Sequence, residues 1–317
     1  GCDLRKMLQQ VLNDGFRWID VRRPTRAEMN QIGQEFRFHE LNLDDSLSKI
    51  QIPKIDRYDD HIFVILHFPT AEQERLPKSA QLATFIGNNY MVTIHQGDLK
   101  SVVDRFDQCK QNDNARQEFM GKSAGYLFHS IVDALTDDLL DLVRKIIGNI
   151  EDIEDVVFDE TVDAAKEISH LRRQIMVLRR IAIPLRRTLT EITMKDLRRF
   201  SDEDLTAYFD DVNDHIDKAI ETLEESKETI EIYKDTDFMH GTDRANKILA
   251  ILTIVFTLSI PATILSSLYG MNVDLPLLPE GDSSASLGRY TTFITIVVGS
   301  TAAAAAMLLY FHKIRWI

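Results

Sequence analysis

Residues 248–272 read ILAILTIVFTLSIPATILSSLYGMN, and this stretch decides the fold of the chain. Its apolar part, residues 248–268, holds no charged side chain. As a helix it spans roughly 30 Å, the thickness of a bilayer's hydrocarbon core. A second uncharged run, residues 290–311, follows a short polar loop. Two spans this close in sequence predict a helical hairpin in a membrane, with both chain ends on one side and the loop on the other.

The charges beside the two spans predict their orientation. Basic side chains lie next to the spans on the side of the chain ends: Arg244, Lys247, Lys313 and Arg315. The loop between the spans carries three acidic residues and one arginine. The positive-inside tendency therefore places the long N-terminal part and the short C-terminus in the cytoplasm, in a multi-pass protein of the inner membrane. No secretory segment opens the sequence, which agrees with this orientation.

The overall composition limits the kinds of partner. The net charge is −13 and 27% of the residues are charged, which argues against binding to nucleic acid or to anionic lipid surfaces through charge. An acidic chain instead attracts cations. Cys2 and Cys109 have no metal-type spacing and predict no disulfide framework.

Residues 1–120 have the pattern of a mixed α/β domain. Strands are expected at residues 16–21 and 61–68, which are rich in β-forming side chains. Residues 81–86 and 90–95 flank Gly-Asn-Asn, a hairpin signal. A short helix is expected at 101–109. This domain contains no phosphate-binding glycine loop, nucleophile elbow or Cys/His metal cluster, so it predicts no enzyme.

Helical periodicity begins near residue 123. Apolar residues between 142 and 157 recur every three or four positions, and a second stripe of this kind covers residues 171–192. Pro184 is expected to kink or break the second helix. The first helix is acidic on its outer face and the second is basic, which predicts two mutually complementary helices; a role in gathering cations is the alternative.

A single long helix is expected to follow. Residues 201–237 hold fourteen carboxylates against three lysines. Ser201-Asp202-Glu203-Asp204 resembles a capping box, and no proline occurs before Pro261. We therefore expect one helix from about Asp202 through the first span to Leu268, about 65 residues or roughly 100 Å long. A helix of this length cannot bury itself alone, so it needs partners.

One face of this helix has an ordered composition. Counting back from the glycine that follows the first span, in alternating steps of three and four, defines a seam. In and near the span, the seam consists of Gly270, Ser267, Thr263, Ile260, Phe256, Thr253, Leu249 and Asn246. Further back it is mainly acidic and includes Asp235, Glu228, Glu225, Glu221, Asp214 and Asp211. A ring of such helices would enclose a path that is polar at its mouth, apolar within and negative below. Leu252 lies beside the seam and can replace Thr253 as the lining residue. Alternatively, the hydroxyl residues of the span only pack one helix against another.

The Tyr-Gly-Met-Asn at residues 269–272, at the end of the first of two C-terminal spans, resembles the CorA family of magnesium transporters. The resemblance covers nearly the whole chain. It implies an α+β membrane protein that assembles as a funnel-shaped homopentamer. Its parts are a cytosolic α/β domain (1–120), a cytosolic helical hairpin (121–200), the cytosolic part of a long stalk helix (201–247), a pore-lining first span (248–268), an outer Gly-Met-Asn loop (269–289), a second span (290–311) and a cytoplasmic C-terminus (312–317).

The resemblance also implies roles for single residues. Gly270, Met271 and Asn272 correspond to the outer selectivity filter, with Thr263 and Ser267 as polar steps below it. Leu249, Leu252, Phe256 and Ile260 occupy the turns of an apolar gate. Mg²⁺ is both the transported and the regulatory ion, with no organic cofactor. The regulatory ion binds between subunits, and Asp211, Asp214 and Glu72 are the candidate ligands, although the segment that holds Glu72 departs from the family pattern.

Two other functions remain open on the sequence alone. The first is zinc transport, the activity of a related branch whose triplet differs at the middle residue; Met271 favours magnesium. The second is a membrane-tethered cytosolic sensor or enzyme. No catalytic motif in residues 1–120 supports the second function.

Overall fold

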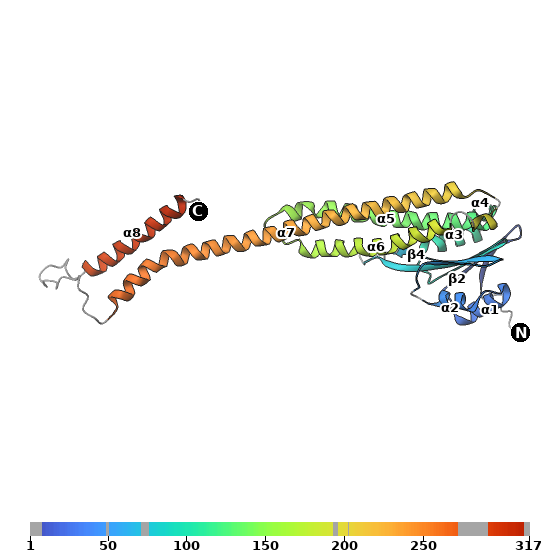
Figure 1. Ribbon diagram of the computed structural model, residues 1–317, viewed down its shortest axis with the longest axis horizontal. Coiled ribbons are helices and arrows are strands. Elements are labelled where there is room, and N and C mark those ends of the chain that lie inside the picture. Colours follow the sequence, from blue (N-terminus) through green and yellow to red (C-terminus); the bar gives the residue numbers. More distant parts are fainter. Residues whose placement is uncertain are drawn as a thin grey trace. The chain divides into compact units, whose positions relative to one another are not determined.

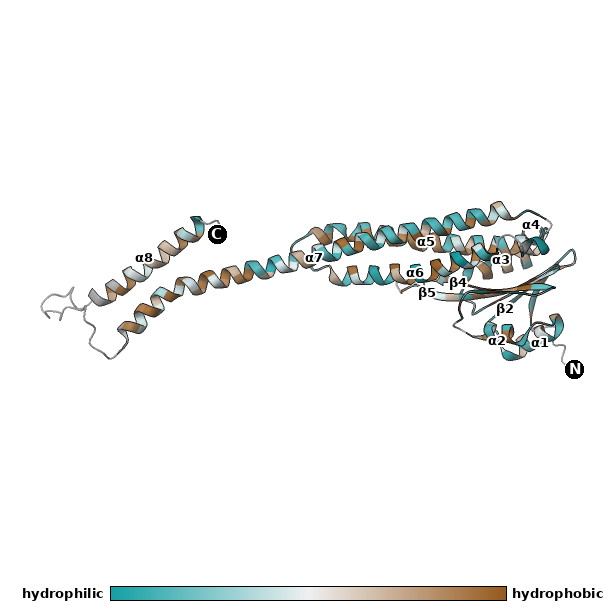
Figure 2. Ribbon diagram, in the orientation of Figure 1, coloured by the Kyte–Doolittle hydropathy of each residue, from teal (hydrophilic) through white to brown (hydrophobic). Residues whose placement is uncertain are grey.

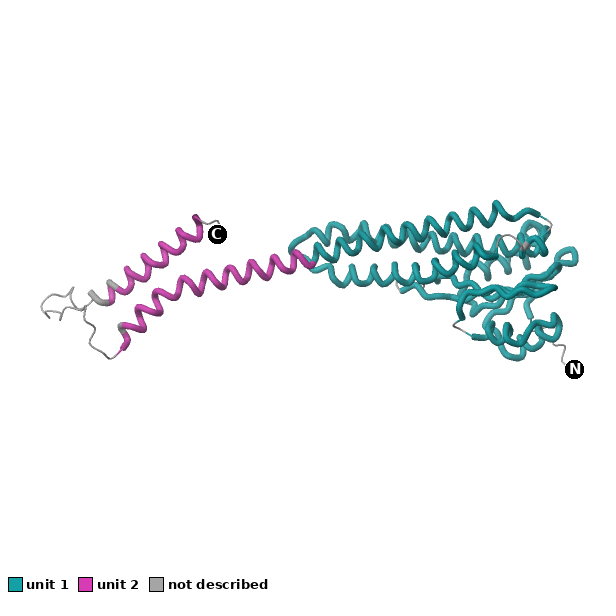
Figure 3. The backbone as a smooth tube through the Cα atoms, in the orientation of Figure 1, with its two compact units in different colours: residues 1–237 teal, residues 238–317 magenta. Residues whose placement is uncertain are grey.

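The computed structural model describes residues 8–48, 51–70, 76–192, 196–201, 203–271 and 291–313. The chain forms two compact units, residues 1–237 and 238–317 (Figure 3). The predictions for Glu72, for Asn272 and for the rest of the outer loop lie outside the described residues.

A six-stranded sheet organises the first unit, in the order β1-β2-β6-β5-β4-β3. Its strands are β1 (Gln9–Asn13), β2 (Phe16–Arg22), β3 (Lys54–Arg57), β4 (His61–Thr70), β5 (Lys78–Gly87) and β6 (Tyr90–His95). The pair β2–β6 is parallel, and the other pairs are antiparallel. The strands predicted from β-forming side chains and the hairpin at Gly-Asn-Asn are confirmed.

Helices cover both faces of the sheet (Figure 1). On one face, α1 (Arg26–Phe36) and α2 (Glu40–Leu47) pack on inward side chains such as Ile19. On the other face lie α3 (Lys100–Gln111), α4 (Asp113–Met120) and α5 (Ala124–Phe158). Trp18 points to this second face, where its ring meets Phe106 edge-on at 5.0 Å. Successive residues of β2 thus serve two separate cores, as strand geometry requires.

A buried polar network ties β2 to β6. The carboxylate of Asp20 accepts hydrogen bonds from Thr93 Oγ1 (2.7 Å), His95 Nε2 (3.1 Å) and Arg22 Nε (2.7 Å). His95 Nδ1 accepts from the Gly97 N–H at 3.0 Å, which leaves Nε2 as the donor. Burial raises the pKa of Asp20, but these hydrogen bonds outweigh it and hold the pKa below its usual value. The side chains of Asp20 and His95 are fully enclosed, so we assign the network a structural role.

Three long helices complete the first unit: α5, α6 (Ala165–Ile192) and the part of α7 (Thr206–Tyr269) up to Asp237. The predicted apolar stripes form their shared core. Pro184 was expected to kink or break the second helix. The break does not occur, because α6 continues through Pro184, with Ile181 and Leu185 buried on either side. A short 3-10 helix (Leu197–Arg199) precedes α7.

The start of α7 differs from the prediction. The helix begins at Thr206 rather than at Asp202, because Asp204 provides the cap: its Oδ1 accepts from the Thr206 N–H at 3.0 Å and from the Thr206 hydroxyl at 2.6 Å. Ser201, the expected cap, instead accepts a hydrogen bond from the Ser123 hydroxyl at 3.0 Å.

Three arginines of α6 pair with acids of α7. We had predicted that they would pair with the acidic face of α5, and no such ion pair occurs among the described residues. The three ion pairs recur every seven residues along both helices: Arg172–Glu231 (3.0 Å), Arg179–Glu224 and Arg186–Asp217 (2.7 Å). Since the arginine number rises as the acid number falls, the two helices run antiparallel in a fixed register. This arrangement leaves the acidic face of α5 unneutralised by α6.

The second unit contains the end of α7 and α8 (Thr291–Lys313). Figure 2 shows the C-terminal part of α7 as predominantly hydrophobic. The best windows of the two helices have mean hydropathies of 2.4 and 1.3, and neither window has buried residues. A Cβ built on Gly299 of α8 would lie 3.7 Å from Leu265 of α7, so the two helices approach closely there.

Candidate functional site

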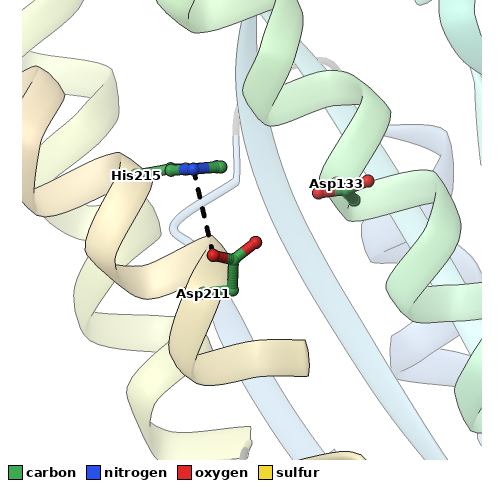
Figure 4. Close-up of side chains that lie close together, drawn as sticks. All are labelled: Asp133, Asp211 and His215. Atoms are coloured by element: carbon green, nitrogen blue, oxygen red, sulfur yellow. Dashed lines mark ion pairs between the residues drawn. The ribbon is translucent and has the colours of Figure 1, made fainter. Parts of the chain in front are cut away.

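Three side chains of the first unit form a potential metal site. Asp211 and His215 project from adjacent turns of α7, and Asp133 comes from α5 (Figure 4). One potential ligand atom from each residue lies within 4.8 Å of the others. His215 Nε2 is 4.0 Å from Asp211 Oδ1, which is too long for a hydrogen bond. The side chains of Asp133, Asp211 and His215 therefore lie close together without forming hydrogen bonds that would use up their ligand atoms.

The surroundings of this group favour a cation. His215 Nδ1 is buried and has no hydrogen-bond partner in the described part of the chain. His129 precedes Asp133 by one turn of α5 and packs edge-on against the Tyr208 ring at 5.1 Å. Burial lowers the pKa of His129, and the nearby Asp133 and Asp211 oppose this shift only in part. At neutral pH, His129 is therefore uncharged and does not repel a bound cation.

The donor set fits a divalent ion. Two carboxylates supply the hard oxygen ligands that Mg²⁺ prefers, and water can complete the octahedron. The imidazole of His215 also suits Co²⁺, Ni²⁺ or Zn²⁺. Asp211 is exposed and the other two residues are half-buried, so the group is accessible to an ion from solution.

The structure brings together only part of the predicted regulatory site. Asp211 belongs to the group, whereas Asp214 is exposed outside it and Glu72 lies beyond the described residues. Sequence reasoning missed Asp133 and His215. The four-residue spacing from Asp211 was a usable signal for His215, because it places both side chains on one face of a helix. Nothing in the sequence links Asp133 to α7.

The predicted seam is exposed along α7 in each unit. In the first unit its acidic members at 211, 214, 221, 225, 228 and 235 all face outward, while the opposite face buries residues such as Phe209 and Leu223. In the second unit the predicted lining residues are likewise exposed: Asn246, Leu249, Leu252, Thr253, Phe256, Ile260, Thr263, Ser267 and Gly270. Phe256, at 67% exposure, is among the most exposed of them.

In the second unit, the face of α7 that packs toward α8 differs from the seam. The less exposed residues of the apolar half recur at spacings of three and four along one side of the helix: Ala250, Ile254, Thr257, Leu258, Pro261 and Leu265. Leu265 is the residue that Gly299 of α8 approaches. The face that packs toward α8 is therefore separate from the seam, which stays uncovered within the unit.

Hydroxyl groups of the apolar half already donate to their own helix. Thr253 Oγ1 donates to the Leu249 carbonyl at 2.7 Å, and Thr263 Oγ1 donates to the Ser259 carbonyl at 2.9 Å. Their protons are thus used, while their oxygen lone pairs remain free to accept. Such oxygens can accept hydrogen bonds from water molecules that surround a cation.

The C-terminal end of α7 forms a tight turn. The Gly270 N–H donates to the Ser266 carbonyl at 2.9 Å, and the Met271 N–H reaches the Leu268 carbonyl at 3.4 Å. A Cβ at Gly270 would lie only 3.0 Å from the Ser266 carbonyl oxygen. A larger residue would therefore crowd this turn, where the helix ends and the predicted filter begins.

Comparisons with known proteins agree with these features. The profile of a family described as "CorA-like Mg2+ transporter protein" matches residues 13–313. The "Cobalt/magnesium transport protein CorA" of Thermotoga maritima is 26% identical over 303 residues, which cover 95% of this chain and 83% of that protein. The "Zinc transport protein ZntB" of Pectobacterium atrosepticum is 25% identical over 173 residues, 55% of this chain and 52% of that protein.

The fold also resembles solved structures. The complete structure of the CorA magnesium transporter from Methanocaldococcus jannaschii superposes with a TM-score of 0.79 at 20% identity, covering 97% of this chain and 93% of that one. The shared architecture is an N-terminal α/β domain, a long helix and two apolar helices.

Proposed function

Because this chain belongs to the CorA-like Mg²⁺ transporter family, and is thus a membrane transporter of divalent metal ions, we propose that it admits hydrated Mg²⁺ into the cell, and also Co²⁺ or Ni²⁺. The ions move down their electrochemical gradient through a homopentameric channel of the inner membrane. Both chain ends lie in the cytoplasm, and the parts of each subunit follow the boundaries predicted above.

The exposed seam of α7 is the observation that carries this proposal. An apolar helix that crosses a bilayer needs no hydroxyl or amide side chains on its lipid face. Here Asn246, Thr253, Thr263 and Ser267 share a face that α8 leaves uncovered. Five such faces around an axis would form a pore with polar steps and an apolar constriction at Leu249, Leu252, Phe256 and Ile260. Asp235 and the other acids below would attract cations.

Transport of a hydrated ion explains why the predicted filter at the end of α7 offers carbonyl and amide oxygens instead of carboxylates. Moving a monovalent ion into a low-dielectric interior costs on the order of 20 kcal/mol, and the cost grows with the square of the charge. Mg²⁺ also gives up its water reluctantly. Carbonyl and amide oxygens at Gly270, Met271 and Asn272 can accept hydrogen bonds from the ion's water without binding it too tightly to leave.

Intracellular Mg²⁺ closes the channel through the cluster on α5 and α7. Asp211 acts as the main ligand with Asp133 and His215, and Asp214 is the next carboxylate along α7. Glu72 of a neighbouring subunit is the candidate partner from the head. Bound Mg²⁺ screens these carboxylates and favours the closed assembly, so that influx stops when the cell is replete.

Zinc transport is the second candidate. The similarity to a zinc transport protein and the imidazole of His215 in the cluster favour it. Uptake by the purified protein in liposomes, with separate indicators for Mg²⁺ and Zn²⁺, decides between the two. We expect saturable Mg²⁺ uptake that needs no nucleotide. Uptake of Zn²⁺ without Mg²⁺ would establish the alternative, and uptake of neither ion would refute both.

A further inference from the structure

The imidazole of His215 is unusual in a site that binds only Mg²⁺. This ion prefers oxygen ligands and keeps several of its waters, so a nitrogen ligand adds little to its binding. The late first-row ions Co²⁺, Ni²⁺ and Zn²⁺ bind imidazole well and also accept carboxylates. The donor set of the cluster on α5 and α7, two carboxylates and one imidazole, therefore suits these ions better than Mg²⁺.

The spacing of the ligand atoms fits one metal ion. Bonds of about 2.1 Å place two ligand atoms about 3.0 Å apart at a right angle and about 4.2 Å apart across the ion. His215 Nε2 and Asp211 Oδ1 are 4.0 Å apart. One ligand atom from each of the three residues, with Asp133 as the third, lies within 4.8 Å of the others. Small side-chain rotations therefore suffice to bring all three groups around an ion.

The packing of α7 holds His215 in position for this role. Asp211 and His215 are four residues apart, so their side chains share one face of the helix. Val212 and Ile216, the next residues along the chain in each case, are fully buried and fix the rotation of the helix about its axis. Because Asp133 comes from α5 of the same chain, the nitrogen and both carboxylates are assembled without a second subunit.

Two imidazole nitrogens beside the carboxylates have no hydrogen-bond partner. His215 Nδ1 and His129 Nδ1 are both buried and unpaired in the part of the chain that the structure describes. The His129 residue is only 9% exposed, and the charges of Asp133 and Asp211 both act on its ring. A buried polar atom without a partner is costly. A water bound to a metal ion in the cluster would satisfy His129 Nδ1 by donating a hydrogen bond to it.

We propose that Co²⁺, Ni²⁺ and Zn²⁺ bind this cluster in the cytoplasm more tightly than Mg²⁺ and close the channel at lower concentrations. His215 is the residue that creates the preference, whereas Asp133 and Asp211 serve both classes of ion. The inference rests on the proposed function and deepens it, because it names the ions that regulate the same cluster. Free ions of this class are far scarcer in cells than Mg²⁺, so only a site that binds them more tightly responds to them.

A nitrogen ligand inside the cell complements the proposed filter. The filter contacts the ion through its waters, and hydrated Mg²⁺, Co²⁺ and Ni²⁺ have the same charge and a similar shell of water. Contacts to that shell therefore discriminate weakly among the three ions. Direct ligation by His215 discriminates strongly, because it depends on the affinity of the bare ion for nitrogen. Closure through the cluster would thus limit the entry of ions that the filter admits along with Mg²⁺.

Inhibition of uptake from the inside tests the inference on the full-length protein. Liposomes are loaded with graded Mg²⁺ or Ni²⁺, and the uptake of isotopically labelled Mg²⁺ is measured. In the parent, Ni²⁺ should stop uptake at a concentration at least about tenfold below that of Mg²⁺. His215→Gln should raise the closing concentration of Ni²⁺ at least about tenfold. The closing concentration of Mg²⁺ should change less than about twofold, because the amide oxygen of glutamine suits Mg²⁺.

A second histidine provides the matched control. His170 is exposed on α6 and lies outside the cluster, so His170→Gln should leave both closing concentrations at the parental values. The side chain of His215 is 40% exposed, so its replacement should leave the core intact, and thermal unfolding checks this. Equal changes for the two ions in His215→Gln, or a parent that Ni²⁺ and Mg²⁺ close at the same concentration, would overturn the inference.

The absorption of bound Co²⁺ gives a second readout that does not depend on transport. Nitrogen is a stronger-field ligand than oxygen, so the visible band of Co²⁺ bound to the parent in detergent should lie at a shorter wavelength than in His215→Gln. His170→Gln should keep the parental band. Identical bands for the parent and His215→Gln would show that His215 is not a ligand, and the inference would fail.

The two readouts separate the inference from the proposed function. If the parent transports Mg²⁺ and is closed by it, but His215→Gln changes neither the Ni²⁺ threshold nor the Co²⁺ band, the inference fails and the proposed function stands. If the parent transports no Mg²⁺, the proposed function fails and the regulation by Ni²⁺ fails with it, whatever the Co²⁺ band shows.

Discussion

The two halves of α7 have opposite relations to the rest of the chain. The half in the first unit buries one face, where Leu223 and Ile230 are fully enclosed, and fixes its flank through three ion pairs with α6. The half in the second unit leaves large apolar residues such as Ile251 and Phe256 exposed. The first half is therefore packed by its own chain, whereas the apolar side chains of the second half are left for lipid and, in the proposed oligomer, for neighbouring copies to cover.

The largest expected effect comes from the end of the second half. Replacing Asn272 with alanine should lower selective Mg²⁺ uptake by at least about tenfold, because an amide that accepts from the hydrated ion is lost. Uptake into liposomes measures this effect, and size-exclusion chromatography should show unchanged assembly. Selective uptake at the parental rate would remove Asn272 from the filter.

Matched leucine substitutions sharpen the comparison within one helix. Leu223→Ala should destabilise the first unit by about 2–5 kcal/mol, because it opens a cavity in a closed core. Leu252→Ala in the exposed half should leave the unfolding of the first unit unchanged and alter the rate of Mg²⁺ uptake instead. Urea unfolding in detergent, followed by circular dichroism, measures the first effect. Equal destabilisation by both substitutions would contradict the division of α7 into two halves.

The stability of the first unit should depend on Asp20 and on pH. Since the pKa of Asp20 is lower in the folded chain than in the unfolded chain, its contribution is fully present above about pH 4. It is lost as the pH falls through the folded pKa. Asp20→Asn should therefore cost about 1–3 kcal/mol at pH 7. The difference from the parent should shrink below about pH 4, as urea titrations at several pH values would reveal; a difference independent of pH would argue against an ionised Asp20.

The metal cluster should affect the regulation of uptake and not its maximal rate. Asp211→Ala should raise the internal Mg²⁺ concentration needed to stop uptake by about tenfold, through loss of one charged ligand. Asp210→Ala is the control, because this exposed carboxylate is a sequence neighbour outside the cluster. Liposomes loaded with graded Mg²⁺ give the closing concentration. Equal thresholds for the parent and for Asp211→Ala would refute the sensor assignment.

Local patterns predicted most of the elements. Alternating and β-branched residues identified β2 and β4, Gly-Asn-Asn identified the β5–β6 hairpin, and the uncharged run of residues 248–268 identified the apolar end of α7. Each of these signals lies within a short window of sequence. The late start of α7 was missed because Ser201 and Asp204 are both good caps, and the contact with Ser123 decides between them.

Contacts between distant segments could not be predicted. The cluster joins Asp133 to Asp211 only because α5 packs beside α7, and the network around Asp20 exists only because β2 pairs in parallel with β6. The pairing of the α6 arginines with α7 instead of α5 has the same cause. In each case the side chains were visible in the sequence, but the packing that selects their partners was not.

The central claim is that the uncovered seam of α7 lines the pore. The most direct test introduces single cysteines at each position from 249 to 267. For each variant, one measures whether a water-soluble thiol reagent blocks Mg²⁺ uptake into liposomes. The account predicts block at seam positions such as Thr253, Ile260 and Ser267, and no block at Ile254 or Leu265, which lie on the face toward α8. Block on the α8 face, or block without helical periodicity, would contradict it.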